Sequence, residues 1–224
     1  MILTDLQMNR LKINCKPLDD LLGGGIESKS ITEVYGEPGS GKTNFCLQAS
    51  RECATDGKIV AYIVSNGLSL ERLNQLCKDH DSKKIFSRIL FFKPTSLKQQ
   101  EDMINNANKI KNLGLIVLDT FNLFYRLTLE NDEKFADRSL NRQITELQMA
   151  AMKKNIFVII SGHVYSTKDD DVKPFAGKGI ERIVKTILKF EKIGIGKRKA
   201  TIIKHPTKSK GSNTFFNISS TGLE

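Results

Sequence analysis

The chain has 224 residues, of which 39% are hydrophobic and 27% are charged, and this composition argues against a mostly disordered protein. Its 35 basic and 25 acidic residues give a formal net charge of +10. The apolar runs are far shorter than the roughly 20 residues that cross a bilayer, and no signal peptide is indicated, so we expect a cytoplasmic protein with no membrane contact.

Apolar, β-rich segments alternate with longer segments of helical periodicity, which is typical of a parallel sheet flanked by helices. The expected strands of this part are 30–35, 59–64, 89–92, 115–118 and 156–160. The expected helices are 43–55, 69–78, 97–110 and 140–153. Three further strands without helices between them, 186–190, 199–203 and 214–218, predict an antiparallel C-terminal edge. We expect irregular loops at 128–137 and 167–178, and one domain over residues 1–224.

The strongest local signal lies between the first strand and the first helix. The run Gly36-Glu37-Pro38-Gly39-Ser40-Gly41-Lys42-Thr43 matches G-x-x-x-x-G-K-[ST]. In such a loop the glycines let main-chain N–H groups surround a β-phosphate, the lysine reaches the β- and γ-phosphates, and the hydroxyl binds Mg²⁺. We therefore expect ATP and Mg²⁺ as cofactors; the alternative is an ordinary Gly-rich turn.

A second magnesium ligand is expected at Asp119, the carboxylate that ends the apolar run 115–118. Ligands of open α/β sheets bind at the carboxyl ends of the strands, and a phosphate-loop protein needs an acid there. The alternative is a strand-ending or helix-capping aspartate.

Cysteines and charge carry weaker signals. Cys15, Cys46, Cys53 and Cys77 form no C-x-x-C pair, which favours small reduced core residues over zinc ligands. Residues 182–210 hold ten basic residues and one acid, so that stretch alone carries +9. Such a segment attracts a phosphodiester backbone, but a lysine-rich solvated face has the same composition, and charge alone leaves both readings open.

Further runs carry a family resemblance that covers nearly the whole chain. They are residues 15–26 before the first core strand, Asp119-Thr120, residues 123–126 and 140–143, Ser161-Gly162-His163-Val164-Tyr165, residues 177–179, Lys204-His205, residues 216–218 and Gly222. Together with the phosphate loop they resemble a RecA-superfamily recombinase core, and more closely the archaeal RadB family of recombinase paralogues. The resemblance implies a RecA-like P-loop NTPase core with a mostly parallel central sheet. Since this core begins within about 20 residues of Met1, we expect no N-terminal helical DNA-binding domain.

The resemblance also implies a function. It points to an ATP-binding, DNA-binding accessory protein of DNA repair, the DNA damage response and homologous recombination that performs no strand exchange of its own. The implied partners are DNA, the main archaeal recombinase and a Holliday-junction resolvase, and a homodimer stays open. A nucleoid-associated location follows from such a role. The alternatives are a clock-type RecA-like ATPase or autokinase and a minimal strand-exchange enzyme.

Two candidate catalytic positions depart from the family pattern. Asn66 stands where relatives usually have a glutamate that polarises the attacking water, and His163 stands where the superfamily has a γ-phosphate-sensing glutamine. An amide cannot accept the water's proton, and the loss of a general base removes a factor of about 10²–10⁴ in rate. We therefore expect weak or absent ATP hydrolysis; Glu71 is a less favoured replacement base.

The resemblance implies two DNA-binding loops, which correspond here to residues 126–142 and 167–178. The candidate contacts are Arg126, Arg138, Arg142, Lys168 and Lys178, with Lys173 as a further candidate. Contacts to phosphates predict binding that depends weakly on sequence and strongly on salt. The acidic run 169–171 opposes this role for the second loop.

Overall fold

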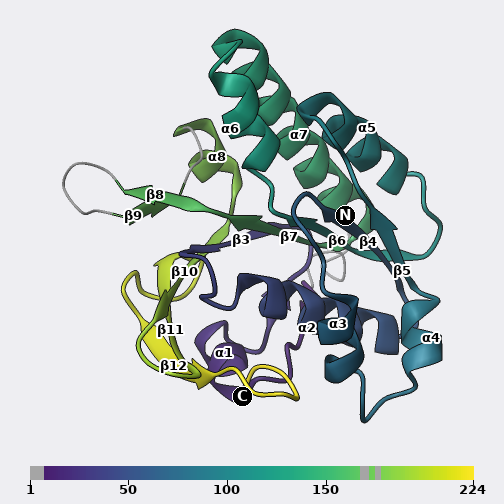
Figure 1. The fold of residues 1–224 in the computed structure, drawn as a ribbon, viewed down its shortest axis with the longest axis vertical. Coiled ribbons are helices and arrows are strands. Elements are labelled where there is room, and N and C mark those ends of the chain that lie inside the picture. Colours follow the sequence, from purple (N-terminus) through teal and green to yellow (C-terminus); the bar gives the residue numbers. More distant parts are fainter. Residues whose placement is uncertain (1–7, 167–171, 175–177) are drawn as a thin grey trace, which may run out of the picture.

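The computed structural model describes residues 8–166, 172–174 and 178–224 and is built around an eight-stranded sheet (Figure 1). Along the sheet the strands lie in the order β12-β11-β10-β3-β7-β6-β4-β5. The six strands from β10 to β5 run parallel, and β11 and β12 pair antiparallel at one edge. Their bounds are β3 Ile31–Gly36, β4 Ile59–Val64, β5 Ile89–Phe92, β6 Leu113–Asp119, β7 Phe157–Gly162, β10 Thr186–Lys192, β11 Lys197–Lys204 and β12 Asn213–Asn217. The predicted mixed sheet with an antiparallel C-terminal edge is confirmed.

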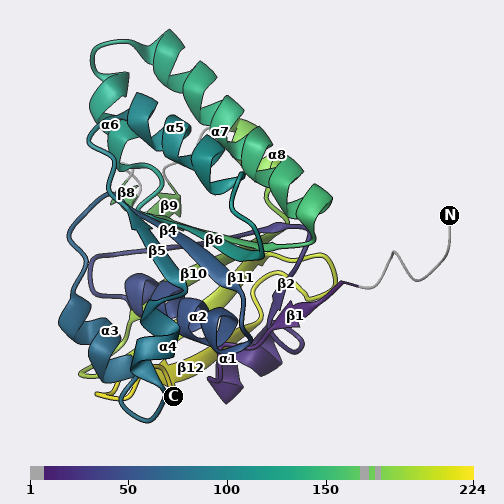
Figure 2. The same cartoon turned by 90° about the vertical axis from the view of Figure 1, so that its right-hand side faces the viewer.

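Helices cover both faces of this sheet, as the view turned by 90° shows (Figure 2). One face carries α1 (Lys16–Leu21), α2 (Lys42–Thr55), α3 (Leu70–Leu76) and α4 (Ser82–Phe86). The other carries α5 (Leu97–Ala107), α6 (Leu123–Leu129), α7 (Glu133–Lys154) and α8 (Lys178–Ile183). Successive strand residues alternate between two apolar cores: Leu115 and Val117 belong to the first and Ile116 and Leu118 to the second. This double burial explains why β6 reads as a continuous apolar run.

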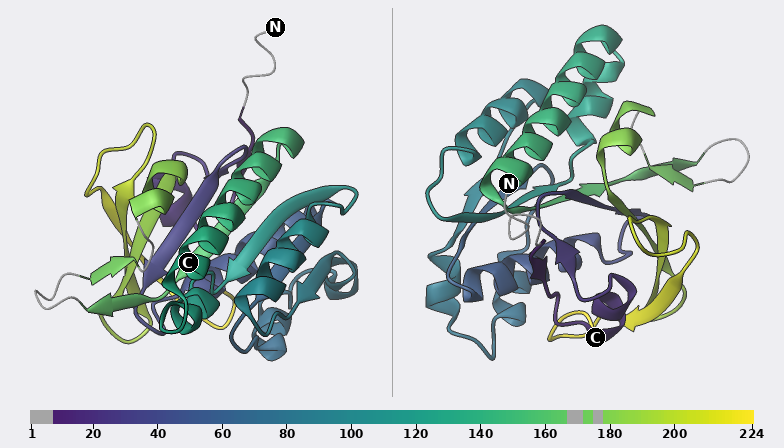
Figure 3. Two further views of the ribbon diagram at one scale, coloured as in Figure 1. Left: turned by 90° about the horizontal axis from the view of Figure 1, so that it is seen from above. Right: turned by 180° about the vertical axis from the view of Figure 1, so that it is seen from behind.

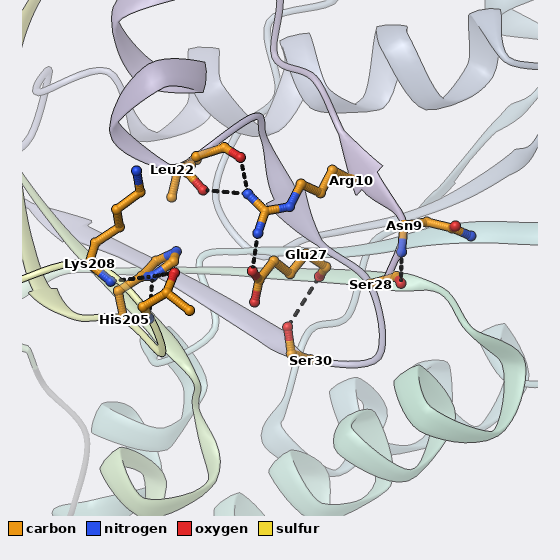
Figure 4. Close-up of polar contacts among 10 residues, drawn as sticks. Asn9, Arg10, Leu22, Glu27, Ser28, Ser30, His205 and Lys208 are labelled. Carbon is orange, nitrogen blue, oxygen red and sulfur yellow. Dashed lines mark hydrogen bonds and ion pairs between the residues drawn. The ribbon is translucent and has the colours of Figure 1, made fainter. Parts of the chain in front are cut away.

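The first described residues form a small antiparallel pair, β1 (Arg10–Leu11) with β2 (Ile26–Glu27). Arg10 donates from Nη2 to the buried Glu27 carboxylate at 2.7 Å and from Nη1 to the carbonyl of Leu22 at 3.1 Å. In the loop after β11, His205 accepts the main-chain N–H groups of Thr207 and Lys208 at Nδ1 (Figure 4). The Arg10 contacts thereby tie β1 to β2 and to the end of α1.

The last residues are fixed to α2, the helix behind the phosphate loop. The Gln48 side chain accepts the N–H of Leu223 at 2.8 Å and donates to the carbonyls of Leu223 and Ile13. Leu223 is buried in the first core. All four cysteines are free and buried on the same side of the sheet, and burial raises their pKa values, that of Cys15 to about 11 and that of Cys53 to about 12.

Both predicted loops need correction. Residues 128–137 are mostly helical, since α6 continues to Leu129 and α7 begins at Glu133. Asp132 caps α7 by accepting the N–H of Phe135 at 2.9 Å. Within the second segment, residues 172–174 form β9, which pairs antiparallel with β8 (Val164–Ser166) in a hairpin that projects from the body (Figure 3); residues 167–171 and 175–177 lie outside the described ranges.

No helix in the described part of the chain is long and apolar enough to cross a membrane.

Candidate functional site

The predicted phosphate-binding loop, residues 36–43 and called the phosphate loop below, connects the central strand β3 to α2, and its backbone requires glycines. A Cβ at Gly36 would collide with the carbonyl oxygen of Phe190 on the neighbouring strand β10. Gly39 and Gly41 have positive φ angles of 75° and 107°, which residues with a Cβ atom rarely adopt. The loop therefore packs tightly against the sheet and keeps a bare main-chain surface at the N-terminus of α2, where the helix dipole favours an anion.

Lys42 lies at the centre of the loop. Its side chain is buried, and Nζ donates to the carbonyls of Gly36 at 2.8 Å and Glu37 at 2.9 Å. Burial lowers the pKa of Lys42, and the nearby Asp119 carboxylate opposes that shift. The lysine is thus held where a polyphosphate would meet the loop.

A cavity of about 210 Å³ lies beside the loop and brings together several of the predicted residues. Its lining comprises Pro38, Gly39, Gly41, Lys42, Thr43, Asn44, Asp119, Thr120 and His163. These come from the loop, from the start of α2 and from the carboxyl ends of β6 and β7. These residues meet because the carboxyl ends of parallel strands lie at the same edge of a sheet.

Asp119 ends β6 with its carboxylate buried and oriented. Oδ2 accepts the hydroxyl of Tyr62 at 2.9 Å, and Oδ1 accepts the hydroxyl of Ser161. Burial and the adjacent carboxylate raise the pKa of Tyr62 well above its usual value, so the tyrosine stays a donor. The two hydroxyls from β4 and β7 therefore fix the carboxylate between the strands.

The donor set fits a magnesium–triphosphate group. Thr43 offers an exposed hydroxyl and Asp119 a fixed carboxylate, the oxygen ligands that Mg²⁺ takes. Lys42 and the main-chain amides of the loop supply positive charge for phosphates. Thr43 and Asp119 would hold the metal, and residues 36–43 would hold the phosphates.

His163 follows β7 and lies at the cavity. Its main-chain N–H donates to Asn122 Oδ1 at 3.2 Å, and the Asn122 amide donates back to the His163 carbonyl at 3.0 Å. The imidazole Nε2 lies 3.4 Å from the Thr120 hydroxyl. Burial and the positive charge of Lys42 lower the pKa of His163, which favours a neutral ring at pH 7 that can donate or accept a hydrogen bond.

Asn66, the other predicted catalytic residue, does not lie at the cavity with His163. It follows β4 in an exposed bend and is absent from the residues that line the cavity. The preceding residue, Ser65, is tied to the edge of the sheet through its N–H, which donates to the Asp119 carbonyl at 2.9 Å. The structure thus brings His163 to the phosphate loop and leaves Asn66 in solvent.

The predicted DNA-contacting residues have different environments. Arg126 on α6 and Arg138 on α7 are exposed. Arg142 forms an ion pair with the buried Glu101 at 2.7 Å, whose second oxygen accepts the Ser139 hydroxyl at 2.8 Å. Lys168 lies outside the described residues, as does the side chain of Lys178, whose main chain begins α8. Arg142 therefore compensates the charge of a buried carboxylate, a role that sequence reasoning did not anticipate.

Two basic residues at the phosphate loop were missed. Arg198 on β11 donates from Nε to the Gly39 carbonyl at 3.0 Å. The main-chain N–H of Lys192, at the end of β10, donates to Glu37 Oε1 at 3.1 Å. The charge of residues 182–210 was visible in the sequence, but only the pairing of β10 with β3 brings it to the loop.

Comparisons with known proteins agree on one family. A sequence profile described as Rad51 matches residues 6–224. The DNA repair and recombination protein RadB of Methanococcoides burtonii is 39% identical over 219 residues, which cover 96% of this chain and 97% of that protein. RadB of Archaeoglobus fulgidus is 33% identical over 98% of this chain and all of that protein. A solved structure described as that of the RadB recombinase has a TM-score of 0.85 at 32% identity, covering 95% of this chain and 98% of that one.

Proposed function

The chain belongs to the Rad51 family, as a DNA repair and recombination protein similar to the RadB proteins, and from this we propose an ATP-regulated, DNA-binding accessory protein of homologous recombination. In this proposal it binds Mg·ATP at residues 36–43 and Asp119 with little or no hydrolysis. It binds DNA through segments that follow β6 and β7, and it regulates a full recombinase rather than exchanging strands itself. Residues 1–224 act as one core unit.

The observation that carries the proposal is the convergence of Lys42, Thr43 and Asp119 on one cavity. A buried lysine, a hydroxyl at the start of a helix and a fixed carboxylate are together the donor set for a metal-bound polyphosphate. When bound, Mg²⁺ would neutralise phosphate charge between Thr43 and Asp119. Lys42 and the loop amides would orient the phosphates.

Slow hydrolysis follows from the surroundings of that cavity. Asn66 can neither accept a proton nor, in its exposed position, reach the cavity lining. His163 is present, and its neutral ring could hydrogen-bond a terminal phosphate. A site that binds without rapid turnover lets ATP act by shifting populations of conformations, because the ligand stabilises the state it binds best.

DNA binding is supported by topology and charge. α6 follows β6, and the β8–β9 hairpin follows β7, so both candidate segments leave the sheet from adjacent strands (Figure 1). Arg126 and Arg138 are exposed on the first of them. Phosphate contacts of this kind are screened by salt, so the affinity should fall steeply as salt rises.

Calorimetry with Mg·ATP tests the nucleotide site. We expect the wild-type chain to bind Mg·ATP and Lys42→Ala to bind it at least ten-fold more weakly, because the variant removes the central cation. Lys78→Ala is the matched control: Lys78 is exposed and is not among the residues that line the cavity, so this variant should bind like wild type. A wild-type chain that gives no heat with Mg·ATP would overturn the proposal.

Fluorescence anisotropy with labelled single- and double-stranded DNA tests the proposed DNA binding. We expect binding at low salt, a log–log salt slope of several units, and an affinity that differs with and without ATP. Absence of binding to either DNA at low salt would remove DNA from the proposed function. A pull-down with the host recombinase and with a Holliday-junction resolvase, with and without ATP, tests the partners.

A further inference from the structure

The strand pair β10–β11 contacts the phosphate loop through one residue of each strand. Arg198 donates to the Gly39 carbonyl, and the N–H of Lys192 donates to the Glu37 carboxylate. Arg198 also donates to the carbonyls of Gly194 and Lys197, which fixes the guanidinium in place. Both ends of the loop's exposed tip, residues 37–39, are therefore held by the antiparallel edge of the sheet.

The ammonium group of Lys192 lies next to this tip. A Cβ placed on Gly39 would lie 2.9 Å from Lys192 Cε and 3.0 Å from Nζ, so the lysine occupies the space that a side chain at position 39 would need. The positive charge of Lys192 is also close enough to contribute to lowering the pKa of Lys42.

Lys192 has no carboxylate partner within ion-pair distance among the described residues. Lys189 on the same strand, by contrast, is paired with Glu191 at 2.9 Å. Two ammonium groups, one buried and one exposed, thus lie at a loop of main-chain amides, and the Glu37 carboxylate accepts the main-chain N–H of Lys192 without forming an ion pair with its ammonium. A polyphosphate in the loop would supply a partner for that ammonium.

We propose that Lys192 is a second phosphate-binding lysine, which approaches the nucleotide from β10 and contacts its terminal phosphate. This rests on the proposed nucleotide site. Lys42 would reach the β- and γ-phosphates, and Lys192 lies close enough to act on the charge of Lys42 from the exposed tip of the loop, so it would meet the same end of the polyphosphate. The γ-phosphate lies at that end, and it carries the charge that distinguishes ATP from ADP. Lys192 is therefore a specificity-determining residue for triphosphates.

Calorimetric titrations of Lys192→Met with Mg·ATP and Mg·ADP test this assignment. Loss of one charge-assisted contact is expected to weaken Mg·ATP about ten-fold, which corresponds to 1.4 kcal/mol. The affinity for Mg·ADP should change less than three-fold. Lys192→Arg, which keeps the charge, should retain Mg·ATP affinity within about three-fold. Because the Glu37 contact uses the main-chain N–H of Lys192, these variants keep it.

Lys197→Met is the matched control, since it removes the same charge from an exposed position on the adjacent strand, where the side chain forms no hydrogen bond or ion pair with the phosphate loop in the described structure and, unlike that of Lys192, does not lie against Gly39. It should bind both nucleotides within two-fold of wild type. The inference is overturned if Lys192→Met binds Mg·ATP within two-fold of wild type, if it loses Mg·ADP affinity equally, or if Lys197→Met loses as much. A wild-type chain that binds no nucleotide would overturn the proposed site and this inference together, whereas the other outcomes leave the site standing.

Discussion

Asn66 is the residue at which the proposed function departs most from an active ATPase. Because Asn66 is exposed and lies outside the cavity lining, Asn66→Glu should raise the rate of phosphate release by less than about three-fold, far below the factor of about 10²–10⁴ that a positioned general base provides. A rise of about ten-fold or more would show that position 66 reaches the bound nucleotide. Asn66→Ala should leave the rate unchanged. The assay is phosphate release under saturating Mg·ATP, and a wild-type rate that is already fast and insensitive to Asn66→Ala would place the base elsewhere.

Glu33 on β3 is a buried carboxyl that the proposed function does not use. Burial raises its pKa to about 7, with a further contribution from Glu181, and Oε2 has no hydrogen-bond partner in the described structure. Because the folded state binds this proton more tightly, the stability from neutral Glu33 is full below pH 4.5 and is lost as the pH rises through about 7.

Glu33→Gln should therefore be more stable than wild type at pH 8 and similar to it at pH 5. Urea unfolding at the two pH values measures the difference, with Glu181→Gln as a control that should show a smaller effect. A Glu33→Gln protein that is less stable than wild type at pH 8 would show that the ionised form is the one accommodated.

At the scale of elements, helix α7 carries two arginines, Arg138 and Arg142. Both are DNA-contact candidates from the sequence, but in the described structure only Arg142 forms an ion pair with a buried carboxylate. Arg138→Ala should change stability by less than about 0.5 kcal/mol, because its side chain is exposed and, within the part of the chain that the structure describes, donates only to the Lys134 carbonyl of its own helix. If it contacts a DNA phosphate, it should weaken DNA binding across sequences and lower the salt slope by about 1. Anisotropy at several salt concentrations measures both.

Arg142→Ala should instead destabilise the fold by about 1–3 kcal/mol, because it leaves the buried Glu101 carboxylate with the Ser139 hydroxyl alone. Arg142→Ala/Glu101→Gln should recover part of this loss. Urea unfolding gives both values, and an unchanged stability for Arg142→Ala would mean that the ion pair with Glu101 contributes nothing.

The N-terminal strand pair depends on a similar contact. Arg10→Ala removes the charged partner of Glu27, which is 5% exposed, together with the hydrogen bonds to the chain around residue 22 (Figure 4). A loss of about 3 kcal/mol is expected, with partial recovery in Arg10→Ala/Glu27→Gln. Hydrogen exchange at Leu11 would rise if β1 detaches before global unfolding.

The elements that the sequence predicted well are those with a single dominant signal. The strands at 59–64 and 89–92 have the expected bounds, because apolar β-branched and aromatic runs between polar turns have no competing helical period. α6 was missed although Leu123, Phe124 and Leu127 follow helical spacing, since the family resemblance favoured a loop there. Asp132 as N-cap with Glu133 in the first turn was the signal that could have placed the start of α7.

At the scale of the whole molecule, the convergence of Lys42, Thr43 and Asp119 at one edge of the sheet was predictable, and the residues around it were not. Residues 36–43 and Asp119 follow from a motif and from the rule that ligands lie at carboxyl ends of parallel strands. Lys192 and Arg198 reach the loop only because β10 is added beside β3 after a long stretch of chain. Strand order in a sheet is set by packing across the fold, and a local pattern does not contain it.

Every cysteine of the chain lies in the apolar layer around α2, and burial keeps the thiols protonated at neutral pH. Maleimide dyes react with accessible thiolates, so the native protein should resist labelling until it unfolds. A single cysteine introduced at exposed Thr221, beside the tail that Gln48 anchors, would then be the sole attachment point for a fluorophore. Ligand binding could therefore be followed with a site-specific fluorophore on the native chain, without first replacing its four cysteines.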